Sequence, residues 1–343
     1  MSAASRIGYC QYLLSSQINY TLTNFADHFE GLSHDKINHY LRNDKLSPKL
    51  VWEHVKGDII EPSSKEDGYI LFDDTVIDKD FSFKIESVRK QYSGNSHGII
   101  KGIGVVTCVY VNKEINKFWI IDFRIFDPDR DGKNKIDHVK EMLNHAQHSK
   151  KISFNTVLID SWYSSREILL MIDQDLQKTY YCPLKKNRLV NDTGKDLPPK
   201  AYTQIEKLEW SKKEKENGKI IAINKFPKSY QAKLFLVTVS NNRTEHVLTN
   251  DMSQNSSDDT RKECAVRWKV EEFHREAKQL TGIEKCQCRK NRIQRNHIAC
   301  AMLVWVKLKK VANETKRTIY QVKHGLLDDY LIEQLKSPVI RFA

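Results

Sequence analysis

The sequence contains no apolar run approaching the roughly 18 residues that a membrane-spanning helix needs. Its first ten residues hold no apolar stretch of the kind found in a secretory signal. The seven cysteines are an odd number scattered from Cys10 to Cys300, which favours reduced thiols over a disulfide framework. We therefore expect a soluble, intracellular protein with no membrane association.

Two further absences narrow the class. No Gly-x₄-Gly-Lys loop is present, so a nucleotide-driven mechanism has no support. No internal repeat is found, and 343 residues with 40% hydrophobic content predict two or three ordinary domains. What the chain does have is basic charge: 56 Lys and Arg against 44 Asp and Glu, a net +12. This excess favours a polyanionic partner, most commonly nucleic acid, although any basic soluble protein shows the same sum.

The first sixty residues have the outline of a helix-turn-helix. A helical pattern at 22–29 is followed by a turn at Gly31, a capping Ser33 and a second helical pattern at 34–43. Lys36 and Arg42 in the second pattern are placed to meet bases or phosphates. An ordinary pair of packed helices fits the same pattern.

After a polar stretch at 61–68, expected to be a linker, the pattern changes to strands and helices. We expect a buried strand at 69–74, an antiparallel hairpin, and then alternating helices and strands, which predicts a mixed α/β sheet flanked by helices. A β-rich insertion with a hairpin turn at Asn217-Gly218 comes next, followed by helices at about 258–282 and 291–313. The strands are expected at 69–74, 99–111, 117–126, 156–160 and 179–182, and the helices between them at 135–148 and 164–172.

Three aspartates stand where strands of this sheet are expected to end. Asp73 and Asp74 follow the first strand, and Asp160 follows a later one. Phosphodiester chemistry is often carried out by carboxylates that hold two Mg²⁺ or Mn²⁺ ions, and hard oxygen ligands suit these cations. Asp also commonly caps strands and starts turns, so each residue alone has an ordinary structural explanation.

The most specific pattern lies in the helix expected at 267–278. At about 100° per residue, one face gathers two cations, a carboxylate and an imidazole beside an apolar stripe. These four residues are Arg267, Glu271, His274 and Lys278. The stripe consists of Val266, Val270, Phe273, Ala277 and Leu280. A simple i,i+4 ion pair between Arg267 and Glu271 is the alternative.

Three segments together resemble the acidic motifs of bacterial insertion-sequence DDE transposases. They are 71–75 (LFDDT), 158–163 (LIDSWY) and 267–278 (RWKVEEFHREAK). The closest group carries a Tyr-x₂-Arg-x₃-Glu-x₆-Lys signature on its last helix, and here Cys264 stands at the Tyr position. The resemblance covers about residues 65–310.

The resemblance implies an RNase H-like core in which a β-rich insertion precedes the helix that carries the last acid. It implies Asp74, Asp160 and Glu271 as catalytic metal ligands for two Mg²⁺ (or Mn²⁺) ions per active site, the preference for Asp74 over Asp73 resting on the Asp-Thr pair. It also implies that Arg267 and Lys278 contact DNA phosphate near the cut.

Other constellations are less specific. The basic run at 289–297 is expected to contact the DNA backbone, because it follows the presumed catalytic helix. Its cations are Arg289, Lys290, Arg292 and Arg295. Cys286, Cys288, His297 and Cys300 have spacings that fit zinc poorly, so core cysteines are favoured. Trp162 and Tyr163 could pack beside the site or fill the core, and the core is the favoured interpretation.

We therefore predict a transposase with four regions: 1–60, helical and DNA-binding; 65–184, the first part of an RNase H-like core; 185–255, the β-rich insertion; and 256–343, the rest of the core with C-terminal helices. It is expected to bind double-stranded DNA at terminal inverted repeats and at the target, as a homodimer on paired ends, by a cut-and-paste route. His274, Lys36 and Arg42 join the basic run in the predicted DNA-binding set. A bacterial cytoplasmic location, with the nucleoid when DNA is bound, is expected. An inactive DNA-binding relic and a structure-selective nuclease are the alternatives.

Overall fold

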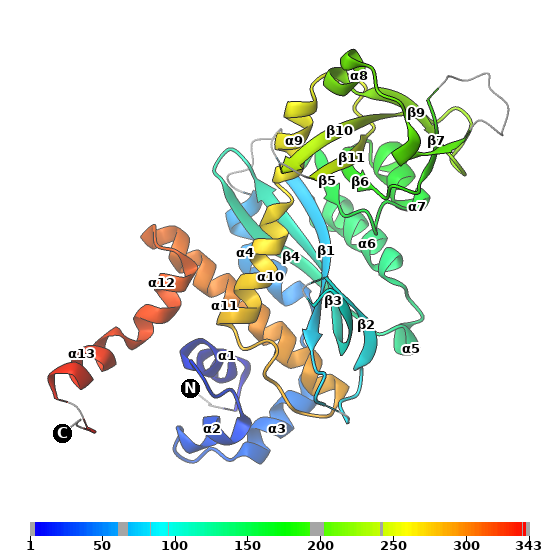
Figure 1. Cartoon of the computed structure of the whole chain (residues 1–343). Coiled ribbons are helices and arrows are strands. Elements are labelled where there is room, and N and C mark those ends of the chain that lie inside the picture. Colours follow the sequence, from blue (N-terminus) through cyan, green and yellow to red (C-terminus); the bar gives the residue numbers. More distant parts are fainter. Residues whose placement is uncertain are drawn as a thin grey trace. The chain divides into compact units, whose positions relative to one another are not determined.

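The computed structural model describes residues 4–60, 68–82, 84–94, 96–192, 202–240, 243–337 and 339–340. The chain divides into two compact units. Figure 1 labels the helices and strands along the chain. Unit 1 comprises Met1–Lys56, Thr75–Val105 and Glu272–Ala343, and unit 2 comprises Gly57–Asp74 and Val106–Glu271. The linker expected at 61–68 falls almost wholly on residues 61–67, outside the described part of the chain. The four regions predicted from the sequence remain a prediction.

The chain begins with four helices, α1 (Arg6–Ser15), α2 (Leu22–Asp27), α3 (His34–Asn43) and α4 (Lys49–Ile60). The predicted helix, turn and second helix are confirmed: Gly31 has φ +72°, and the Ser33 hydroxyl accepts the Lys36 N–H at 3.3 Å as the α3 cap. Helix α3 buries Ile37 and Leu41 completely and packs on α2 and on α11 (Asn291–Thr315).

A mixed sheet forms the core of unit 2. Its strands lie in the order β4-β3-β1-β5-β6, with β1, β5 and β6 parallel. Because parallel strands in mid-sheet are covered on both faces, the run Tyr69–Phe72 in β1 and all but the first residue of β5 are buried. This order is that of an RNase H-like sheet, as the resemblance implied. The strands are β1 (Gly68–Asp78), β3 (Gly98–Asn112), β4 (Lys117–Phe126), β5 (Thr156–Ile159) and β6 (Thr179–Leu184).

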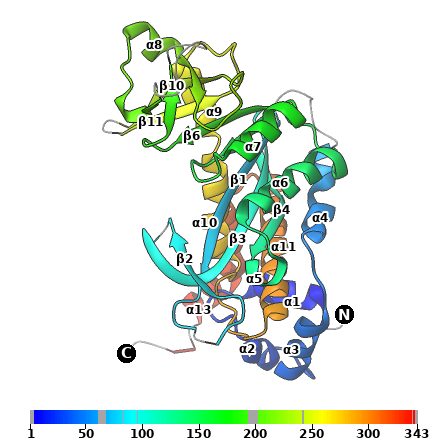
Figure 2. The same cartoon turned by 90° about the vertical axis from the view of Figure 1, so that its right-hand side faces the viewer.

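The crossover helices agree with the predicted ranges but end in wider turns. Helices α6 (Lys135–Asn144) and α7 (Arg166–Leu170) each continue into a π-helical turn, at His145–Ser149 and Met171–Asp175. A short α5 (Pro128–Asp131) precedes α6, which packs on β4 and α7 and runs beside β4 in Figure 2. Strand β2 (Arg89–Ser93), antiparallel to β3, was not predicted.

The insertion is β-rich, as predicted, and it extends the core sheet. Strand β11 is antiparallel to β6, and the order continues β11-β10-β9-β7-β8. The predicted hairpin turn at Asn217-Gly218 is wrong: Asn217 ends helix α8, and Gly218, with φ +77°, is its C-cap. The elements are β7 (Leu189–Asn191), β8 (Thr203–Gln204), α8 (Lys212–Asn217), β9 (Lys219–Ile223), β10 (Ala232–Ser240) and β11 (Arg243–Thr249).

The single helix expected at about 258–282 is two helices, α9 (Ser257–Ala265) and α10 (Trp268–Leu280). Short i→i+3 bonds to the carbonyls of Val266 and Arg267 form the junction, so the chain tightens there before α10 begins. Helices α12 (Ile319–His324) and α13 (Asp328–Lys336) follow α11. Within the described ranges no helix has the length and apolar character required to cross a membrane. The predicted α/β class, a mixed sheet flanked by helices, is confirmed.

Candidate active site

Asp73 and Asp74 lie inside β1, which continues to Asp78, and not at a strand end as predicted. The prediction failed because β1 continues past the apolar run with half-buried residues. Parallel β1 and β5 pair Phe72 with Ile159, and Asp73 and Asp160 are the residues that directly follow this pair. Asp160 lies just past the end of β5, and the charges of Asp74 and Asp160 both act on the Asp73 carboxyl.

The Asp73 carboxyl carries a strong electrostatic penalty. Burial, and then the negative charges of Asp74 and Asp160, raise its pKa to about 7. Two effects lower this pKa and offset the rise only in part. The Asp74 N–H donates to Asp73 Oδ1 at 2.8 Å, and the positive charge of Arg267 acts on the carboxyl. A carboxyl held among like charges is typical of a functional position.

Asp74 has two strong partners. The Tyr163 hydroxyl donates to Asp74 Oδ1 at 2.7 Å, and the Lys135 ammonium contacts Oδ2 at 2.5 Å. Lys135 is the first residue of α6, and Tyr163 lies in the turn that follows β5. Neither contact was predicted from the sequence, because Lys135 and Tyr163 are far from Asp74 along the chain.

Tyr163 fills the core as predicted, but Trp162 does not, since 49% of it is exposed. The Trp162 ring meets the Tyr163 ring edge-on at 4.9 Å, and Lys135 Nζ lies 5.5 Å from the Trp162 centroid. The indole thus stands at the surface directly beside the aspartate cluster.

Glu271 lies on the first turn of α10 and pairs with Arg267, Oε1 to Nη1, at 3.6 Å. This is the i,i+4 pair that the sequence left as an alternative. No set of three His, Cys, Asp or Glu side chains within the described ranges is close enough together to hold a metal ion. The structure thus brings Asp73, Asp74 and Asp160 into one electrostatic cluster, while the Glu271 carboxylate is directed to Arg267.

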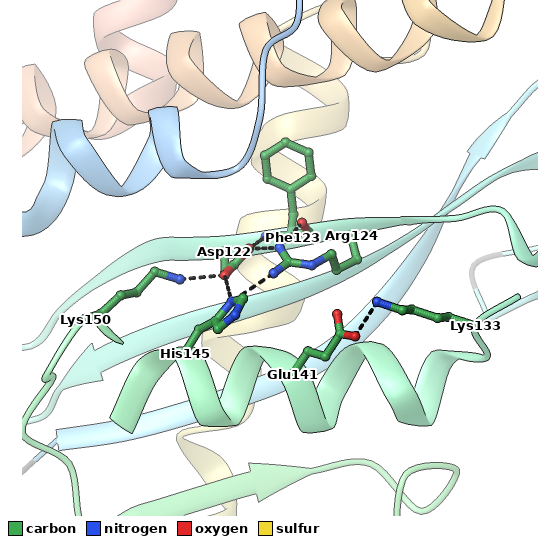
Figure 3. Close-up of polar contacts among 7 residues, drawn as sticks. All are labelled: Asp122, Phe123, Arg124, Lys133, Glu141, His145 and Lys150. Carbon is green, nitrogen blue, oxygen red and sulfur yellow. Dashed lines mark hydrogen bonds and ion pairs between the residues drawn. The ribbon is translucent and has the colours of Figure 1, made fainter. Parts of the chain in front are cut away.

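The residues nevertheless fit a hard divalent cation in their chemistry. Asp73 and Asp160 are adjacent oxygen donors whose mutual repulsion a cation would relieve. Asp160 has no side-chain hydrogen bond or ion pair with any described residue. Asp122, on β4, is the contrasting case: it is buried but bonded to Arg124 and, at 2.5 Å, to Lys150 (Figure 3). A buried acid neutralised in that way is structural, whereas the Asp73 carboxyl is exposed to the like charges of Asp74 and Asp160.

Unit 1 contains the other two predicted residues of the α10 face. Lys278 Nζ donates to the Val76 carbonyl at 2.8 Å and pairs with Glu284 at 3.3 Å. His274 is buried, and burial lowers its pKa to about 3, so its ring is neutral. A buried neutral imidazole has no positive charge to offer a phosphate, so we do not propose His274 as a DNA contact. Helical periodicity predicted which face of α10 carries the His274 side chain. It could not predict which residues pack over that side chain and bury it.

The remaining predicted DNA contacts are at the surface of unit 1. Lys290 pairs with Glu86 at 2.9 Å, and Arg295 Nε donates to Asn291 at 2.5 Å. Lys36 and Arg42 are exposed on α3, on the side away from its buried residues. Arg289 is exposed, and Arg292 is partly exposed.

The zinc alternative finds no support at His297. Its Nδ1 accepts the Tyr9 hydroxyl at 2.8 Å, and its Nε2 lies 3.1 Å from the Gly282 carbonyl oxygen. Both ring nitrogens are thus used inside the protein. Cys264, at the signature's Tyr position, is a neutral thiol because burial raises its pKa to about 12.

Comparison with known proteins gives one extensive match. The model of a family described as "Transposase DDE domain" matches residues 69–307, more than two thirds of the chain. No curated protein matches. A cryo-EM structure of a piggyBac transposase synaptic complex with hairpin DNA is 10% identical and covers 98% of this chain and 73% of that chain, with a TM-score of 0.46. A Drosophila P element transposase strand transfer complex is 12% identical and covers 45% and 33%, with a TM-score of 0.26.

Proposed function

Since the chain belongs to the family of DDE transposases, we propose that it is the transposase of an insertion sequence, binding terminal inverted repeats and moving the element by a cut-and-paste route. Enzymes of this family cleave DNA and transfer the cleaved strands with divalent metal ions, and the activity of this chain is of that class. The family match supports the class. The position of Asp73 and Asp160 directly after the paired residues Phe72 and Ile159 is the observation within the structure that supports the site.

The proposed metal ligands are Asp73, Asp160 and Glu271. The sequence favoured Asp74 as the first ligand, but we propose Asp73, because both oxygens of Asp74 are engaged by Tyr163 and Lys135. Asp73 and Asp160 also directly follow the paired residues Phe72 and Ile159. Glu271 joins this pair when its carboxylate leaves Arg267, a surface ion pair that costs little to separate. We propose Mg²⁺ as the ion, two per site.

Asp73, Asp160 and Glu271 would hold the two ions. The chemistry that the ions would supply when bound is activation of the attacking hydroxyl and stabilisation of the leaving oxygen. Water opens the phosphodiester at each end of the element and leaves a 3′-OH. This hydroxyl then attacks target DNA directly, without a covalent bond to the protein. Arg267, released from Glu271, is placed to meet the phosphate beside the cut.

Double-stranded DNA is the proposed partner. The exposed cations of α3 and of 289–295 supply phosphate contacts, which position the duplex, while α3 is the element suited to reading bases. Because cut-and-paste requires both ends to be held together, we propose a homodimer on paired ends.

Asp160→Asn tests the proposal. With Mg²⁺ and a DNA fragment that carries the terminal repeat, the variant should lose donor cleavage by a factor of at least about 10³, because an essential metal ligand is gone. Binding of the fragment in a gel-shift assay should persist. Asp175→Asn, an exposed aspartate on the same unit, is the matched control and should cleave normally.

Cleavage by Asp160→Asn at the wild-type rate would remove Asp160 from the site. Specific binding without any metal-dependent nicking by the wild type would instead identify an inactive relic. Cleavage of generic branched DNA without strand joining would identify a nuclease.

A further inference from the structure

Three side chains from three elements form a hydrogen-bonded line across the sheet. The Tyr163 hydroxyl donates to Asp74 Oδ1 at 2.7 Å, and Lys135 Nζ contacts Asp74 Oδ2 at 2.5 Å. Tyr163 follows β5, Asp74 lies in β1, and Lys135 begins α6. Both oxygens of Asp74 are therefore engaged by the protein itself.

The line is shielded from water. Tyr163 is fully buried, and only 12% of the Lys135 side chain and 18% of the Asp74 side chain are exposed. The Lys135 ammonium lies 5.4 Å from the Phe126 centroid and 5.5 Å from that of Trp162, two rings that favour a cation. Charge-assisted bonds of this kind, held away from solvent, fix the position of a carboxylate firmly.

This line connects β1, which carries Asp73, to the turn that Asp160 begins after β5. Tyr163 belongs to the turn that Asp160 begins, and its own N–H donates to the Asp160 carbonyl at 3.0 Å. At the other end, Asp74 is covalently joined to Asp73. A bond from Tyr163 to Asp74 thus limits how far Asp160 can move from Asp73.

We propose that Asp74 is a positioning residue, anchored by Tyr163 and neutralised by Lys135, which holds Asp160 at the spacing from Asp73 that metal binding needs. This inference rests on the proposed function. It means that three residues affect the affinity for the metal without contacting it, namely Asp74, Tyr163 and Lys135. Partners that orient metal ligands typically contribute about 10- to 100-fold to affinity.

Mn²⁺ binding by the full-length protein without DNA, measured by calorimetry, tests the inference. Asp73→Asn should abolish binding. Tyr163→Phe, which removes only a hydroxyl, and Asp74→Asn should each weaken binding by about 10- to 100-fold. Lys135→Met should weaken it similarly, and Lys135→Arg should restore most of the affinity because the charge returns. Tyr180→Phe is the matched control, since Tyr180 is also fully buried and loses a hydroxyl bond of 2.8 Å, to Tyr230, away from the site.

Two results would overturn the inference. The first is an unchanged Mn²⁺ affinity in both Tyr163→Phe and Asp74→Asn. The second is a loss of binding in Asp74→Asn as complete as in Asp73→Asn, which would make Asp74 a metal ligand. Should Tyr163→Phe fail to fold in a thermal melt, Asp74→Asn and the Lys135 pair decide alone. Binding that survives both Asp73→Asn and Asp160→Asn would contradict the proposed metal site itself.

Discussion

The buried imidazole of His297 makes the stability of unit 1 sensitive to pH. Burial is the main cause that lowers its pKa to about 4, with a smaller contribution from the Lys79 charge. In the unfolded chain the ring titrates near pH 6.5, so between pH 6.5 and 4 the unfolded state binds a proton that the folded state refuses. The contribution of the neutral His297 ring to the free energy of unfolding is fully present above pH 6.5 and is lost as the pH falls toward 4. The total loss is ~3 kcal/mol.

Urea unfolding at pH 7.5, 6 and 5 measures this effect. The free energy of unfolding should fall with pH in the wild type, and it should fall less steeply in His297→Gln, which lacks the titrating ring. His148→Gln, at an exposed histidine, should keep the wild-type slope. An unaltered slope in His297→Gln would show that other groups carry the pH dependence.

At the scale of the element, α3 separates its functions by face. Ile37 and Leu41 hold the helix on the protein, whereas Lys36 and Arg42 are exposed and add nothing to that packing. Lys36→Ala and Arg42→Ala should therefore leave the melting temperature unchanged. Each should weaken binding of the terminal repeat by about tenfold, the effect of one lost phosphate or base contact.

Fluorescence anisotropy with a labelled repeat measures this binding. Lys49→Ala, an exposed lysine on the neighbouring helix α4, is the control and should bind as the wild type does. Equal affinities for all three variants would mean that α2 and α3 are an ordinary packed pair and not a DNA reader.

At the scale of the whole molecule, the net charge of +12 predicts binding that depends strongly on salt. Each phosphate that the protein neutralises releases counterions, so a protein making several such contacts loses about 10³-fold or more in affinity between 50 and 200 mM salt. A plot of log affinity against log salt for a generic duplex checks this, and Arg42→Ala should lower the slope by about one. A flat plot would contradict electrostatic binding.

The amino-acid pattern alone determined the elements and the motifs. The apolar run before Asp73, the cap at Ser33 and the stripe of Val270, Phe273 and Ala277 on α10 are local features, and local periodicity is enough to predict them. The acidic motifs likewise depend on spacing along the chain, which is why the family could be identified before any fold was known.

Only the tertiary structure distinguished the surroundings of neighbouring residues. The sequence preferred Asp74 to Asp73 on the Asp-Thr pair alone, whereas the fold brings Tyr163 and Lys135 onto Asp74 and leaves the Asp73 carboxyl under the charges of Asp74 and Asp160. The burial of His274 could likewise not be predicted from the sequence. Register and burial depend on segments far apart in the chain, and a local pattern carries no information about what packs against it.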